Sequence, residues 1–83
     1  MTMPPTPATL TAIRRRCATR GAVLAALRSL AKETGPVAAV GIGISPATLN
    51  YLENDRTDPR VSTLEVVAAY YGVTLGDLTP LPR

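Results

Sequence analysis

Apolar residues recur three or four positions apart through most of this 83-residue chain, and that spacing places them on one face of an α-helix. The pattern predicts four core helices, near residues 22–33, 35–42, 46–53 and 63–71. The expected inward positions are Val23 or Leu24, Leu27, Leu30 and Ala31 in the first helix, Ala38, Ala39 and Ile42 in the second, Leu49 and Leu52 in the third, and Leu64, Val67, Ala68 and Tyr71 in the fourth. The chain is therefore expected to fold as an all-α bundle.

Residues that favour helix ends flank the second and third of these segments. Thr34 and Ser45 can cap them, because a threonine or serine hydroxyl at this position accepts a backbone N–H two or three residues on. Pro46 suits the first helical position, where its missing N–H costs nothing. Gly43 and Gly72 can adopt the left-handed conformation that ends many helices. Both ends of the second helix, the start of the third and the end of the fourth are thus specified locally.

Two further capping signals come later in the chain. The stretch Ser62 to Glu65 fits a capping box, so the fourth core helix is expected to begin at Thr63. Thr74 is expected to cap a last short turn through Leu78, which Pro80 then ends.

The first 21 residues differ from the rest. Residues 1–7 contain three prolines and are expected to be disordered. Residues 8–21 form either a helix, with apolar residues on one face and arginines opposite, or a basic arm without fixed structure. Gly21 is expected to break or bend the chain before a helical domain at 22–79, and residues 80–83 form a tail.

A helix, a tight glycine turn and a capped second helix follow one another in residues 34–53, which is the order of a helix-turn-helix motif. From Leu24 to Leu78 the chain resembles the Cro/C1-type (XRE-like) helix-turn-helix family of bacterial and phage transcriptional regulators. The resemblance rests on Gly43-Ile44-Ser45, Leu49, Leu52, Glu53-Asn54, Pro59, Thr63-Leu64, Val67-Ala68, Gly72-Val73-Thr74 and Leu75-Gly76-Asp77-Leu78. The segment Ser-Pro-Ala-Thr also occurs at this turn in LacI-like domains, but Glu53-Asn54 and the final helices favour the Cro/C1 type.

The resemblance implies a small lambda-repressor-like bundle of four to five short helices, here with the basic arm or an extra helix in front. It implies a sequence-specific DNA-binding transcriptional regulator, with a repressor as the leading interpretation. Such a protein places residues 46–53 in the major groove of double-stranded DNA and acts as a homodimer. In that family a basic residue at the place of Arg28 pairs with the glutamate that ends the recognition helix, here Glu53. The alternative is two unrelated surface charges, worth less than ~1 kcal/mol.

The candidate DNA contacts fall in three groups. On the recognition helix, Asn50 could read adenine, Ala47 could pack on a thymine methyl, and Tyr51 could bond a phosphate or a base edge. The full set is Thr34, Ser45, Pro46, Ala47, Thr48, Asn50 and Tyr51 from the helix-turn-helix, Asn54, Arg56 and Arg60 from the loop after it, and Arg14, Arg15 and Arg16 from the N-terminal arm. Gly35 departs from the family pattern, in which a glutamine follows the cap and touches a phosphate.

The charge of the chain is unevenly distributed. Its formal net charge is +3, yet residues 1–21 carry four arginines and no acid, while residues 22–83 carry five basic and six acidic residues. Neutralisation of phosphates supplies much of the affinity of a protein for DNA. The helix-turn-helix unit is therefore not basic, and the N-terminal arm is expected to supply the missing charge.

Outward apolar residues keep a second interpretation open. The residues expected to project away from the core are Val37, Val40, Val66 and Tyr70. A dimer interface is the simplest use for them in a chain whose mean hydropathy is +0.14, and the expected seam is Leu75, Leu78 and Leu81. The alternative is an antitoxin-like or co-regulator module that uses the same fold and these apolar residues to bind a protein partner.

The composition excludes the usual sites of catalysis and metal binding. The chain has no His and one Cys, so it lacks the usual imidazole base and the usual zinc ligands. We expect no enzymatic activity, no cofactor and no metal. No apolar run approaches the roughly 20 residues that span a bilayer, and Cys17 alone cannot form an intramolecular disulfide. The expected location is the cytoplasm, without a membrane partner.

Overall fold

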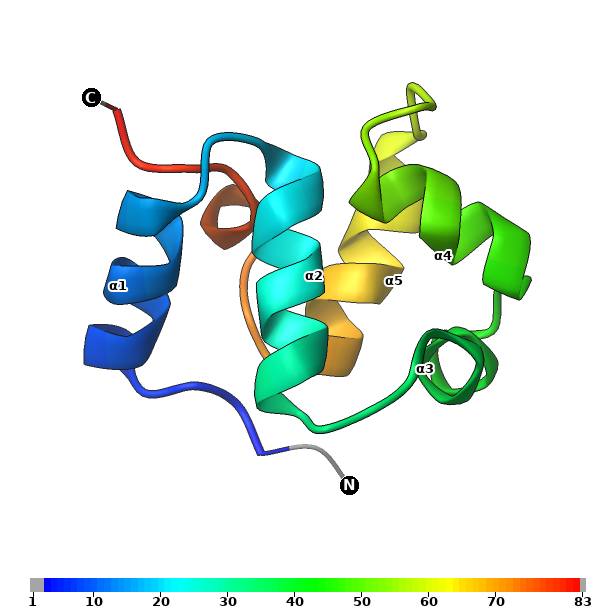
Figure 1. Cartoon of the computed structure of the whole chain (residues 1–83), viewed down its shortest axis with the longest axis horizontal. Helices are drawn as coiled ribbons and strands as arrows, with labels where there is room; N and C mark the ends of the chain where they lie inside the picture. The colour runs from blue at the N-terminus through cyan, green and yellow to red at the C-terminus, as the bar shows by residue number, and fades with distance from the viewer. Residues whose placement is uncertain (1–2, 83) are drawn as a thin grey trace.

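The computed structural model describes residues 3–82, and the secondary structure of these residues is entirely helical (Figure 1). The elements are α1 (Pro7–Arg16), α2 (Arg20–Leu30), α3 (Gly35–Ile42), α4 (Pro46–Glu53), α5 (Val61–Tyr71) and a 3-10 helix, η1 (Gly76–Leu78). The predicted all-α fold is confirmed, and α3 and α4 have the predicted bounds. None of the described helices has the length and apolar character needed to cross a membrane.

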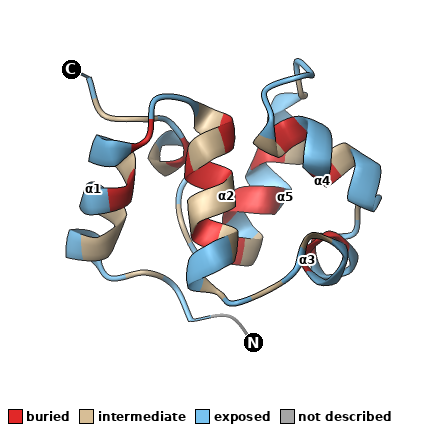
Figure 2. Cartoon of the chain, viewed as in Figure 1, coloured by how far each residue is buried: buried red, intermediate tan, exposed pale blue. Residues whose placement is uncertain are grey.

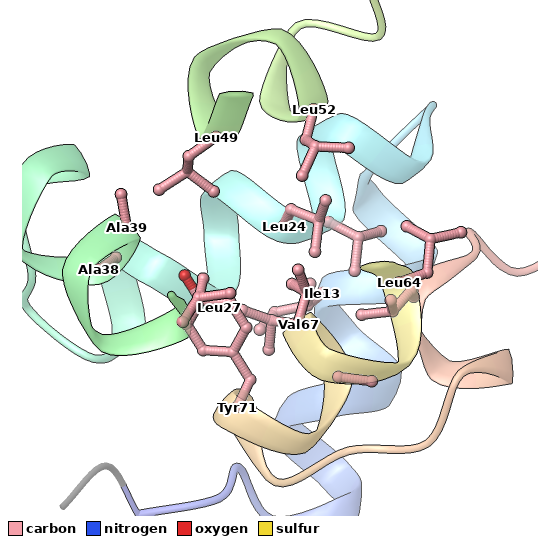
Figure 3. Close-up of a cluster of buried hydrophobic side chains, with 14 of the residues drawn as sticks. Ile13, Leu24, Leu27, Ala38, Ala39, Leu49, Leu52, Leu64, Val67 and Tyr71 are labelled. Atoms are coloured by element: carbon pink, nitrogen blue, oxygen red, sulfur yellow. The ribbon is translucent and has the colours of Figure 1, made fainter. Parts of the chain in front are cut away.

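The helix α2 lies in the middle of the molecule (Figure 1). The helices α1 and η1 lie on one side of α2, while α3 and α4 lie on the other, and α5 closes the bundle behind. The molecule measures 31 × 27 × 20 Å. The side chains of α2, α4 and α5 meet between these helices in one hydrophobic cluster, which Ile13 of α1 joins (Figure 3).

The buried positions agree with the predicted stripes in α3, α4 and α5, all of whose expected inward residues are buried (Figure 2). In α2, Val23, Leu24 and Leu27 are buried, but the prediction for Leu30 is wrong, because its side chain is 47% exposed. Leu30 is the last residue of α2, and the chain turns away at Lys32, which has φ 58°. The core therefore takes its α2 residues from the first turns of that helix.

The bounds of α2 differ from the prediction for a local reason. The Thr19 hydroxyl accepts the Ala22 N–H at 3.1 Å, so the helix begins at Arg20 and not at Ala22. Gly21 consequently lies in the first helical turn and does not break the chain. At the other end, the left-handed conformation of Lys32 stops the helix before Glu33.

The predicted capping box at the start of α5 is also wrong. The helix begins at Val61, and the residue before it, Arg60, makes no side-chain cap hydrogen bond. Ser62 is already inside the first turn, so it cannot act as the cap. A reciprocal pair of capping bonds occurs instead around η1, where Asp77 N–H donates to Thr74 Oγ1 (3.2 Å) and Thr74 N–H donates to Asp77 Oδ2 (3.0 Å).

The N-terminal basic segment is a helix, which decides between the two conformations left open by the sequence. Thr6 caps α1, and Ile13 and Cys17 are buried against the bundle. Pro4 approaches Gly72 at the end of α5 closely. The disorder expected over residues 1–7 falls in part on Met1, which with residues 2 and 83 lies outside the described residues.

The C-terminal segment packs against α1 and is held there by hydrogen bonds to Arg14. The Arg14 Nε donates to the Thr79 carbonyl at 2.8 Å, and the Leu81 N–H donates to the Arg14 carbonyl at 3.0 Å. Leu78, predicted to form part of an intermolecular seam, is fully buried, because η1 packs against both α1 and α2. The prediction that Leu78 forms an intermolecular seam together with Leu75 and Leu81 is therefore wrong for Leu78.

Candidate nucleic-acid interface

The helix α4 is held between a tight turn and the core. Gly43 ends α3 with φ 94°, and Ser45 Oγ then accepts the Thr48 N–H at 3.1 Å to cap α4. On the inner face, Leu49 and Leu52 are buried. One face of this two-turn helix is consequently fixed against α2 and α3, and the opposite face is left at the surface.

The outer face of α4 presents small and neutral side chains. Pro46, Ala47, Asn50 and Tyr51 are all exposed, with Tyr51 at 49%, while Thr48 is half-buried (Figure 2). An Asn side chain can bond both hydrogen-bonding groups of an adenine edge, and small apolar side chains fit a thymine methyl. The chemistry of this face suits A·T pairs better than G·C pairs, because α4 carries no arginine or lysine.

The end of α4 is anchored to α2 by an ion pair. Arg28 Nε donates to Glu53 Oε2 at 2.7 Å, and Arg28 Nη2 donates to Glu53 Oε1 at 2.9 Å. The third nitrogen, Nη1, donates to the Glu33 carbonyl at 3.1 Å. The hydrogen bond to Glu53 raises the pKa of Arg28 above its ordinary value. The pair expected from the family resemblance is thus present, in a bidentate form that fixes the orientation of both planar groups.

The loop after α4, residues 54–60, carries three of the candidate contacts, and two of them are bonded to α4. Asn54 Nδ2 donates to the Asn50 carbonyl at 2.8 Å, and Arg56 N–H donates to the Tyr51 carbonyl at 3.0 Å. Arg56 and Arg60 are exposed. Asn54 and Arg56 are therefore held directly against the end of α4, while Arg60 lies at the start of α5.

The one candidate at the start of α3, Thr34, is exposed at the surface. The Thr34 hydroxyl accepts the Val37 N–H at 3.4 Å, and Thr34 itself is exposed. Because α3 packs against α4, the cap of α3 belongs to the same helix-turn-helix unit as the outer face of α4.

The structure does not bring the arginines of α1 to this surface. The helices α1 and α4 lie on opposite sides of α2 (Figure 1). Arg14 is engaged by the Thr79 carbonyl and by Asp77, whose Oδ1 lies 3.6 Å from Arg14 Nη1. Arg15 and Arg16 are exposed. Of the three predicted N-terminal contacts, Arg15 and Arg16 are thus exposed on a helix that lies across α2 from α4 (Figure 1).

A contact that the sequence analysis missed joins the loop to α2. Asp55 Oδ1 accepts the Gly21 N–H at 3.0 Å across a separation of 34 residues. Asp55 is one of two non-glycine residues in the described chain with a positive φ, at 56°. No local pattern links these positions, and Gly21 resembled an ordinary helix breaker.

Three of the four residues predicted to project outward do so. Val37 and Val40 on α3 and Val66 on α5 are exposed, with Val40 at 78%. The prediction for Tyr70 is wrong, because its ring lies over Gly41 and its hydroxyl donates to the Glu33 carboxylate at 2.7–2.8 Å. The large exposed apolar residues of these two helices are consequently all valines, with Val61 as the fourth.

The surface of residues 3–82 holds neither a cavity nor a cluster of three or more Cys, Asp or Glu residues that could hold a metal ion. The candidate site is instead an exposed helix with flanking loops. A family model described as helix-turn-helix matches residues 37–78, which is half of the chain. No curated protein matches the sequence.

Proposed function

Because the chain belongs to the Cro/C1-type (XRE-like) helix-turn-helix family of DNA-binding transcription regulators, we propose that it is a repressor that binds double-stranded DNA as a homodimer. In this proposal α4 enters the major groove and the loop 54–60 follows the phosphate backbone. The family is one of regulators and not of catalysts, so no reaction is proposed. The protein acts in the cytoplasm, where bacterial and phage operators are found.

The observation that carries the proposal is the exposed outer face of α4. Asn50 and Tyr51 are exposed on it, one turn after the Ser45 cap, while Leu49 and Leu52 hold the helix to the core. A helix presented in this way can approach base edges without rearrangement of the bundle. Ser45, Pro46, Ala47 and Thr48 line the same end of the helix and complete the proposed base-contacting surface.

Positioning on the duplex is assigned to the residues around α4. Asn54, Arg56 and Arg60 from the loop and Thr34 from the cap of α3 are exposed and can bond phosphates. Arg15 and Arg16 on α1 contribute longer-range attraction, which acts on all sequences alike. Arg14 contributes less, because its guanidinium already bonds the C-terminal segment.

A homodimer is supported by the exposed valines and by the symmetry of typical operators. Two copies of α4 reading half-sites one helical turn apart double the small number of base contacts that one copy offers. Val37, Val40 and Val66 supply apolar surface for association.

The second candidate function keeps the fold and changes the partner. In an antitoxin-like or co-regulator module, the valines of α3 and α5 bind another protein and DNA binding is secondary. The same exposed valines support this alternative, together with the excess of acidic over basic residues in 22–83. The two functions differ in whether the purified protein alone binds DNA.

The test is a titration of fluorescent DNA duplexes with the purified protein at several salt concentrations. Sequences enriched from a random pool should bind more tightly than a scrambled duplex. Asn50→Ala should shrink that difference by about 1–3 kcal/mol, since a bidentate base contact contributes that much discrimination. No binding to either duplex at low salt would reject DNA binding by the protein alone and favour the protein-partner function.

A further inference from the structure

The loop that follows α4 is tied to the start of α2 by one side chain. Asp55 Oδ1 accepts the Gly21 N–H at 3.0 Å, and this bond is partly buried. A β-carbon on Gly21 would lie 2.6 Å from Asp55 Oδ2 and 2.5 Å from the Glu53 carbonyl oxygen. Only glycine at position 21 therefore allows the end of α4 and its loop to come this close to α2.

The backbone of Asp55 adopts the left-handed conformation, which aspartate tolerates better than most residues other than glycine and asparagine. Its φ of 56° is in the left-handed region, where a side chain is disfavoured. The conformation aims the carboxylate back at α2 and reverses the chain directly after Asn54.

The negative charge of Asp55 is stabilised by the N-terminus of α2. The first turn of α2 contains no acidic residue and includes Arg20, and the N-terminus of a helix attracts negative charge. Asp55 therefore directs its carboxylate into its own protein, on a surface where a bare carboxylate would repel DNA phosphates.

From these contacts we propose that Asp55 is a positioning residue for DNA binding, and this inference rests on the proposed function. Its bond to Gly21 holds the loop 54–60 in the conformation that presents Asn54 and Arg56 to the phosphates. Asp55 itself touches no DNA. Loss of its carboxylate frees the loop, and the loop must then be ordered again each time DNA binds.

Removal of the Asp55 carboxylate should change DNA affinity in the direction opposite to the usual effect of removing a negative charge. Removing a negative charge from a DNA-binding surface ordinarily strengthens binding, because repulsion of the phosphates is relieved. Asp55→Ala should instead weaken binding to every sequence by roughly fivefold, the equivalent of one lost hydrogen bond. The matched control is Asp58→Ala, which removes the same charge from an exposed position of the same loop and should bind as tightly as the wild type or more tightly.

The experiment compares wild type, Asp55→Ala, Asp55→Asn and Asp58→Ala on a random-sequence duplex of about two helical turns. Circular dichroism at the assay temperature establishes that each variant is folded. Asp55→Asn keeps an acceptor for Gly21 and should recover most of the affinity lost in Asp55→Ala. The salt dependence of binding should become shallower in Asp55→Ala, by up to about 0.9 for each lost phosphate contact, and stay unchanged in Asp58→Ala.

Hydrogen exchange of the Gly21 amide tests the contact without DNA. Exchange should be faster in Asp55→Ala than in the wild type and in Asp58→Ala. Tighter DNA binding by Asp55→Ala, with an unchanged salt dependence, would overturn the positioning role. Absence of DNA binding by the wild type would reject the proposed function and the positioning role together, while unchanged exchange at Gly21 would reject the contact alone.

Discussion

At the scale of single residues, the Arg28 guanidinium connects α2 to the end of α4 and to the segment before α3. It bonds both oxygens of Glu53 and the carbonyl of Glu33, and the Glu53 side chain is only 10% exposed. Lysine could not make all these bonds, because an ammonium is a point charge without the planar donor fork of a guanidinium. We expect Arg28→Lys to lower the free energy of unfolding by about 1–3 kcal/mol.

Urea unfolding of the variant measures this loss. Arg15→Lys is the control, since Arg15 is exposed on α1 and should change stability by less than about 0.5 kcal/mol. Equal effects of the two substitutions would mean that the bidentate geometry contributes nothing to stability.

The buried hydroxyl of Tyr71 is the second feature at the residue scale. The residue is 1% exposed, and its hydroxyl has no hydrogen-bond partner among the described residues. Burial, aided by the nearby carboxylates of Glu53 and Glu33, raises the pKa of Tyr71 above its ordinary value. The phenol therefore stays protonated in the folded protein at pH values where the unfolded chain ionises.

The consequence is a loss of stability in alkali. Above about pH 10 the unfolded state releases the phenolic proton and the folded state keeps it, so the free energy of unfolding falls as the pH rises, by up to about 1.4 kcal/mol per pH unit. Tyr71→Phe should be neutral or stabilising at pH 7, because no bond is lost, and should remove this alkaline loss. Thermal unfolding at pH 7 to 11 would measure both. A loss above ~1 kcal/mol at pH 7 would show that the hydroxyl has a partner.

At the scale of elements, α3 and α5 meet through a glycine. A β-carbon on Gly41 would lie 2.6 Å from the ring of Tyr70, whose hydroxyl is held by Glu33. Glycine inside a helix costs roughly 0.5–1 kcal/mol relative to alanine. The helical preference of α3 thus favours alanine at position 41, whereas the close packing against Tyr70 requires glycine.

A double-mutant cycle separates these two effects. Gly41→Ala alone should destabilise the protein, because Tyr70 must leave its position. In a Tyr70→Ala background the same change should stabilise by roughly 0.5–1 kcal/mol, since the space is then open and the helix preference remains. Stabilisation of the same size in both backgrounds would contradict the contact between α3 and α5.

Much of the fold at this scale could be predicted from local signals. The bounds of α3 and α4 follow from Thr34, Gly43 and Ser45, each of which acts on its own turn. The start of α5 was not predicted correctly, because Ser62 suits a capping box in sequence, whereas the helix begins at Val61 without a side-chain cap hydrogen bond. Local chemistry thus fixed the helix-turn-helix but not every helix end.

The features that could not be predicted depend on contacts between residues far apart in the sequence. Leu78 is apolar and suited an interface, but only the packing of α1 and η1 shows that it is buried. The bond between Gly21 and Asp55 spans 34 residues. The Arg28–Glu53 pair spans 25 residues and could be expected only because the family resemblance supplied both partners.

At the scale of the whole molecule, two sets of arginines lie in different places. Arg56 and Arg60 belong to the loop between α4 and α5, and Arg20 lies at the start of α2, next to the glycine that Asp55 contacts. Arg15 and Arg16 lie on α1, across α2 from the recognition helix (Figure 1). A single duplex lying along α4 can contact the first set directly, whereas the second set acts through solvent.

The salt dependence of DNA binding distinguishes contact from distant attraction. Each phosphate contact contributes about 0.9 to the slope of log affinity against log salt. Replacing Arg56 and Arg60 together by alanine should therefore flatten the slope by up to about 1.8, which is two such contacts. Replacing Arg15 and Arg16 should weaken binding to all sequences at low salt and change the slope less, because attraction beyond a Debye length of about 10 Å is screened at 0.1 M salt. Equal flattening by both pairs would mean that DNA also contacts α1, and the duplex would then have to extend around α2 instead of lying along α4 alone.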